Sequence, residues 1–167
     1  LSAWNMSTAT NIGSMFLGCT NFNQPLNWNV SNVTNMASLF QNATSFNQPL
    51  NSWDVSKITT MNGSFAGANS FNQPLNNWNV SLVTNMNAMF QSATAFNQDI
   101  SSWNFNVNVT LSNFMSNKTF ANYTASFYSN LLVKWNLRFI GTGRTQTSKI
   151  ITMNTIRHSS SGSAPRA

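Results

Sequence analysis

Large apolar side chains recur along this chain at a period of 24 or 25 residues, with polar stretches between them. Tryptophans lie at positions 4, 28, 53, 78 and 103. Phenylalanines keep the same period at 16, 40, 65 and 90, and again at 22, 46, 71 and 96. This period is typical of a repeat protein, because one unit of this size cannot bury its apolar face without a neighbour stacked on it.

The repeat divides the chain into five predicted coils followed by two further segments. The coils comprise residues 1–25, 26–49, 50–74, 75–99 and 100–123. Beyond them, large apolar residues recur every four positions, which predicts an amphipathic helix laid across the last coil. These residues are Tyr123, Phe127, Leu131 and Trp135. We therefore expect a C-terminal cap over residues 124–140, with a possible closing strand at 137–140, and a basic, largely irregular tail over residues 141–167.

The apolar positions inside one coil predict its local elements. In the third coil a polar residue separates Trp53 from Val55, which predicts a short β-strand over residues 49–55 with alternate side chains facing the core. The spacing of Met61, Ser64 and Phe65 is close to that of a helix, which predicts a helical turn over residues 59–65. Each coil is expected to hold one short strand and one short helical turn.

The aligned coils share the pattern MF-x-x-A-x-x-FNQPLN-x-WNVS-x-VTNM. It is carried by residues 15–36, 39–61, 65–86 and 89–111, and it fades in the fifth coil. This pattern resembles the BspA-type leucine-rich repeats, in the Asn-rich, DUF285-like variant found in mycoplasma lipoproteins and in surface proteins of other organisms. The resemblance implies a leucine-rich-repeat-like solenoid, coiled right-handedly and closed by a C-terminal helical cap. It also implies an extracellular or surface-exposed location.

Chemically reactive side chains are scarce, which argues against an enzyme. The chain has two aspartates, Asp54 and Asp99, one histidine, one cysteine and no glutamate. The two aspartates occupy different columns of different repeats and form no acid–base pair. Cys19 falls in the column of Ala43, Ala68 and Ala93 and is expected to fill a small buried slot. We expect no catalytic residue, no metal site and no cofactor.

The net charge of +6 does not point to nucleic acid once its distribution is considered. Up to Met115 the charged side chains are Lys57, Asp54 and Asp99, which gives 1 − 2 = −1. The remaining residues carry seven Lys and Arg and no acid, and six of the seven lie in the predicted cap and tail. Nucleic acid is therefore an unlikely partner. The most apolar stretch, residues 131–140, is far shorter than the ~20 residues of a membrane span.

The residues flanking each predicted strand Trp are the candidate binding residues. Stacking places them in rows on one face of the predicted sheet, and solenoids commonly bind through such extended faces. A plain solvated face is the alternative. The candidates are Asn27, Asn29, Ser52, Asp54, Asn77, Asn79, Ser102 and Asn104.

Two further columns favour a structural role. Asn23, Asn47, Asn72 and Asn97 recur at a coil corner, where an inward Asn can bond to unpaired backbone groups of the next coil. The adjacent Gln24, Gln48, Gln73 and Gln98 leave structure and recognition equally open.

Three functions follow from these observations. The first is a secreted or cell-surface module for adhesion or protein recognition, with a protein or cell-surface ligand bound on the polar sheet face. The second is a structural spacer or coat component assembled through the ends of the array. Because Leu1 starts a coil with no cap before it, we expect an exposed apolar end there and possible end-to-end contact. The third is glycan binding, which buried tryptophans would disfavour.

Overall fold

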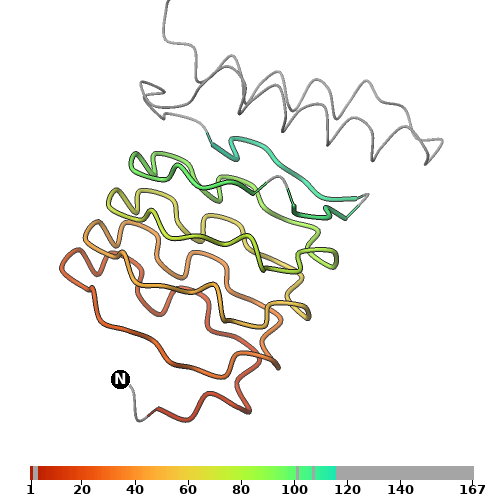
Figure 1. The fold of residues 1–167 in the computed structure, drawn as a ribbon, viewed down its shortest axis with the longest axis horizontal. Helices are drawn as coiled ribbons and strands as arrows, with labels where there is room; N and C mark the ends of the chain where they lie inside the picture. Colours follow the sequence, from red (N-terminus) through yellow and green to blue (C-terminus); the bar gives the residue numbers. More distant parts are fainter. Residues whose placement is uncertain (2–3, 101, 107, 116–167) are drawn as a thin grey trace, which may run out of the picture.

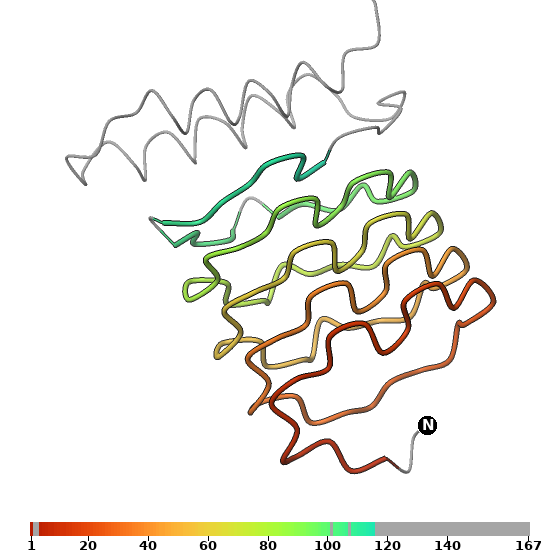
Figure 2. The ribbon, with the colours of Figure 1, turned by 180° about the vertical axis from the view of Figure 1, so that it is seen from behind.

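The structure is a computed structural model that describes residues 1, 4–100, 102–106 and 108–115. Within these residues the chain forms successive coils of 24 or 25 residues, each lying directly on the one before (Figure 1). The view from behind shows the same order (Figure 2). The predicted cap over 124–140 and tail over 141–167, with the end of the fifth coil, lie outside the described residues.

Neighbouring coils are joined by a ladder of single parallel β-bridges in one column. The bridges are Asn11–Asn35, Asn35–Thr60, Thr60–Asn85 and Asn85–Thr110. Among the described residues there is no longer strand and no α-helix. The ladder runs through the segment for which a helical turn was predicted, whereas the predicted strand over 49–55 has no bridge to another coil. Both local predictions are therefore wrong in their placement.

A series of consecutive turns explains why residues 36–43 form no helix. The N–H groups of Met36, Ser38, Phe40 and Asn42 donate to carbonyls of the next coil, at 3.2, 2.8, 2.8 and 2.7 Å. The N–H groups of Leu39, Gln41 and Ala43 instead donate to the carbonyl three residues back. An α-helix needs every N–H to bond four residues back within the same segment. Here every second N–H belongs to the neighbouring coil.

These turns require left-handed backbone at two positions in each coil. Ser38, Gly63 and Ala88 are equivalent and have φ of 56°, 62° and 55°. Asn42 and Gly67 are also equivalent and have φ of 59° and 68°. Left-handed residues interrupt an α-helix. Since most of these positions hold residues other than glycine, the turns are difficult to predict from the sequence.

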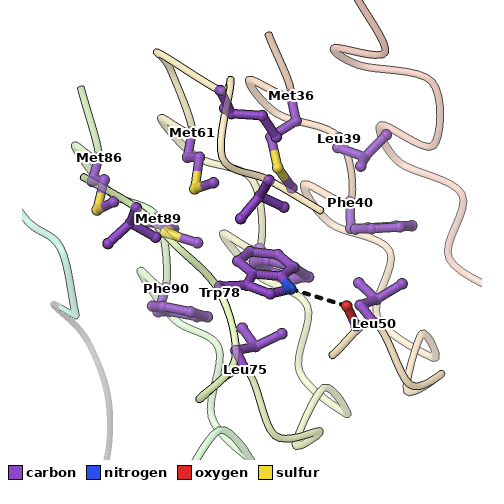
Figure 3. Close-up of a cluster of buried hydrophobic side chains, with 14 of the residues drawn as sticks. Met36, Leu39, Phe40, Leu50, Met61, Leu75, Trp78, Met86, Met89 and Phe90 are labelled. Atoms are coloured by element: carbon purple, nitrogen blue, oxygen red, sulfur yellow. Dashed lines mark hydrogen bonds between the residues drawn. The ribbon is translucent and has the colours of Figure 1, made fainter. Parts of the chain in front are cut away.

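The core is a set of side-chain columns running through the coils. Phe40, Phe65 and Phe90 occupy equivalent positions in successive coils and are fully buried. Each ring stacks on the next with centroids 5.5 Å apart. Each buried Trp also donates its indole N–H to a backbone carbonyl of the preceding coil. Figure 3 shows this bond from Trp78 to Leu50, at 2.9 Å, within the apolar cluster. The columns hold the coils together both by burial and by hydrogen bonding.

The coils are closer together on the ladder side than on the Trp side. Where equivalent rings in two neighbouring coils are nearly parallel, the distance between their centroids measures the local spacing, or step, from coil to coil. Between the first and second coils this step is 5.5 Å for Phe16 to Phe40 but 6.1 Å for Trp4 to Trp28. A pure translation would give one value throughout, so successive coils are rotated. Since hydrogen-bonded strands lie about 4.8 Å apart, the stack opens from the ladder toward the tryptophans.

The first coil exposes side chains that later coils bury. Trp4 is 51% exposed, whereas Trp28 in the next coil is 5% exposed. Cys19 is also exposed, which corrects the prediction that it fills a buried slot. Its equivalent Ala43 is buried because described coils lie on both of its sides, whereas Cys19 has a described coil on one side only.

Candidate functional site

The eight candidate binding residues are all exposed and alternate with buried residues of the core. Between Ser52 and Asp54 lies Trp53, which is 4% exposed. We call this set the Trp-side strip. It comprises Asn27, Asn29, Ser52, Asp54, Asn77, Asn79, Ser102 and Asn104. The prediction that these rows occupy a sheet face is wrong, because the β-bridges run through a different column.

The second row of the strip also shapes the backbone. The side-chain oxygens of Asn29, Asp54 and Asn79 accept the backbone N–H two residues later, at 3.1, 3.0 and 3.2 Å. This contact closes an Asx-turn, a conformation for which Asn and Asp are well suited. This role was not predicted. Its signal was present as Asn or Asp, then Val, then Ser, in three successive coils.

The turns use only part of the hydrogen-bonding capacity of these side chains. In Asn29 and Asn79 the oxygen is engaged, and the amide nitrogen has no partner among the described residues. The side chains of Asn27 and Ser52 make no hydrogen bond within the same part of the chain. In contrast, the Ser102 hydroxyl donates to the Asn76 carbonyl at 3.0 Å. The strip thus presents donors that the fold holds in place without using.

The strip carries very little charge. Hydrogen bonds from the side chain and backbone of Ser56, with a smaller contribution from the Lys57 ammonium, lower the pKa of Asp54 below its ordinary value of 3.8. Asp54 is therefore ionised near neutral pH. The Lys57 ammonium donates to Asn32 at 2.8 Å. Recognition by this surface would depend on hydrogen bonds more than on charge.

The Asn and Gln columns at the coil corner bond to each other across coils. The Asn23 side-chain oxygen accepts the Asn47 backbone N–H at 2.9 Å, and Asn47 accepts that of Asn72 at the same distance. The Gln48 and Gln73 amides donate to these same oxygens, at 2.9 and 3.1 Å. Both columns therefore have a structural role, including the Gln column that the sequence left open. None of these side chains is fully buried, although an inward Asn was expected.

Two further kinds of site can be assessed in the described part of the chain. No three His, Cys, Asp or Glu side chains gather there in an arrangement that could hold a metal ion. No helix among those residues is long and apolar enough to cross a membrane.

Comparison with known proteins identifies the family. A family model described as "Mycoplasma protein of unknown function, DUF285" matches the chain over residues 1–82 and again over 26–135. The two matches together cover most of the sequence, and they include every coil seen in the structure. The chain belongs to the DUF285 family. No curated protein and no solved structure matches this DUF285 chain.

Proposed function

We propose that this chain is part of a BspA-type, leucine-rich-repeat-like solenoid. In this proposal it is a non-enzymatic, surface-exposed module for protein interaction or adhesion, and the Trp-side strip is its binding surface. The observation that supports the strip is that its eight residues are exposed in four successive coils. An extended ligand would meet equivalent side chains at each coil, as solenoid ligands commonly do.

The physical state of the strip also supports binding. Polar side chains that already have an ordered position lose less conformational entropy when they bind. The Asx-turns provide this order at Asn29 and Asn79 without using their amide nitrogens. The same surface lacks the paired acids, bases and nucleophiles that catalysis requires.

Capture of surface proteins tests this proposal. The full chain is immobilised and mixed with a host or neighbouring-cell surface extract. It should bind protein ligands, and chemical cross-linking then fixes the bound ligands to the chain for detection. Asn27→Ala and Ser52→Ala together should reduce retention, because both side chains belong to the proposed binding surface. The variant should keep its fold, because these exposed side chains make no hydrogen bond to the described residues. Ser70→Ala with Ala95→Ser, both exposed outside the strip, is the matched control. Equal retention by the two double variants would refute the strip as the binding surface.

A second candidate is a spacer or coat component assembled through the ends of the array. Leu1 and Trp4 in the first coil are 41% and 51% exposed, and any further coil stacked on that side would cover both. Sedimentation velocity should then show association that rises with concentration and falls for Trp4→Ser. Glycan binding has less support, because the other described tryptophans are at most 5% exposed and donate their indole N–H to backbone carbonyls.

A further inference from the structure

The spacing of the Trp-side strip resembles the repeat of an extended polypeptide. Ring centroids in the Trp column are 6.1, 6.2 and 6.3 Å apart for the pairs Trp4–Trp28, Trp28–Trp53 and Trp78–Trp103. A β-strand rises about 3.2–3.4 Å per residue, so groups on the same edge repeat at about 6.4–6.8 Å. Because the stack opens away from the ladder, the step at the strip is at least that of the tryptophans. Each coil would therefore meet one same-edge group of a strand.

The donors on the strip suit the carbonyl groups of such a strand. In Asn29 and Asn79 the Asx-turn fixes the side-chain oxygen and thereby orients the amide. The remaining amide N–H groups of Asn29 and Asn79 lie two coils apart, because Asp54 occupies the equivalent position in the coil between them. A strand lying along the stack presents one carbonyl on the same edge at every second residue. Because one coil corresponds to one same-edge carbonyl, donors two coils apart can bond to every second carbonyl on that edge without contacting the side chains of the ligand.

The low charge of the strip also favours a main-chain ligand. Of its eight side chains only Asp54 is charged. A surface that recognised charged groups would be expected to carry complementary charge. In the third coil the Asp54 carboxylate keeps the Asx-turn but offers no donor, so this coil is the weak point of the row.

We propose that the Trp-side strip binds an extended peptide segment along the axis of the stack, through side-chain amide donors to alternate main-chain carbonyls. This inference rests on the proposed function and names its ligand class. The ligand is an uncharged stretch of β-conformation. A strand of ten residues is about 33 Å long, which is enough to cross the four coils that carry the strip.

A defined peptide tests the inference. The probe is a dye-labelled, end-capped decapeptide of alternating Thr and Val, N-methylated at every second residue so that one edge stays open and strands cannot aggregate. A capped proline decamer is the control, because its carbonyls point in three directions along the helix. Fluorescence anisotropy with the full chain should show saturable binding of the first peptide and none of the second.

Substitutions that keep the turns but change the donors give the sharper readout. Asn29→Asp with Asn79→Asp retains the accepting oxygens, as Asp54 does naturally, and removes two donors. Affinity should fall at least about fivefold, from the usual net worth of two hydrogen bonds. Asp54→Asn adds a donor and should tighten binding about twofold to tenfold. Ser70→Asp with Ala95→Asp adds the same charge outside the strip and should have no effect.

Unchanged affinity in the Asn29→Asp, Asn79→Asp variant would overturn the inference, and so would equal binding of the proline decamer. Displacement of the peptide by a cello- or chito-hexaose would also overturn it, because it would indicate a glycan site. If the wild-type chain ignores the peptide while the strip variants still lose captured proteins, the extended-peptide inference fails and the proposed function stands. If neither peptide nor protein binding depends on the strip, both fail.

Discussion

Replacing a buried tryptophan should destabilise this chain far more than replacing the equivalent exposed one. Trp53 is 4% exposed, stacks on Trp28 at 6.2 Å and donates its indole N–H to the Leu26 carbonyl at 3.1 Å. A buried aromatic ring of about 200 Å² contributes about 5 kcal/mol by area, and measured Trp→Ala changes cost about 3–5 kcal/mol. The lost hydrogen bond is part of that cost. Trp53→Ala should therefore lower the free energy of unfolding by about 3–5 kcal/mol.

Trp4 provides the matched control in the first coil. It is 51% exposed, so Trp4→Ala removes about half the buried area and should cost about 1.5–2.5 kcal/mol. Urea denaturation of both variants, followed by circular dichroism and tryptophan fluorescence, measures the difference. A loss below about 1 kcal/mol for Trp53→Ala, or equal losses for both variants, would contradict the stacked-column account of the core.

Three further changes probe the backbone and the polar contacts. Ala88→Gly should raise the free energy of unfolding by about 0.5–1 kcal/mol and Gly63→Ala should lower it by a similar amount, because both positions have φ near +60°. Thermal denaturation should show the two changes as opposite shifts of the melting temperature. The stability contributed by Asp54 is present above its unfolded pKa and is lost as pH falls through its lowered folded pKa. Asp54→Asn should therefore remove part of the acid-side fall in melting temperature. Ser64→Ala removes the buried hydroxyl that bonds to the Met36 and Met61 carbonyls, each of which keeps a backbone N–H donor, and should lower the free energy of unfolding by about 0.5–1.5 kcal/mol in urea denaturation.

The core could be predicted from the sequence because burial follows directly from the spacing of apolar residues. In the third coil the predicted inward residues are all buried. They are Leu50, Trp53, Val55, Ile58, Met61, Phe65, Ala68 and Phe71. No knowledge of the backbone conformation was needed for this result, since any coil that repeats must place equivalent side chains in the same column.

The local elements could not be predicted, because they depend on backbone bonds between coils. Alternation around Trp53 indicates which side chains face inward, but it does not reveal which backbone groups pair. The left-handed positions would have indicated turns if they were glycines, as at Gly63 and Gly67. The equivalent Ser38 and Ala88 give no such signal. The exposure of the strip was predicted correctly, whereas its place on a sheet was not.

Asparagine in the Trp-side strip does more than the fold requires. Asp54 forms the same turn as Asn29 and Asn79 with comparable geometry, at 3.0 Å against 3.1 and 3.2 Å. An oxygen acceptor is therefore sufficient for the backbone. The corner column differs, because there the oxygen of Asn47 accepts both the Asn72 N–H and the Gln73 amide, so the fold uses it twice. The fold therefore does not need the amide nitrogens of Asn29 and Asn79, which lie on exposed side chains two coils apart, and these are the groups that a bound main chain would use.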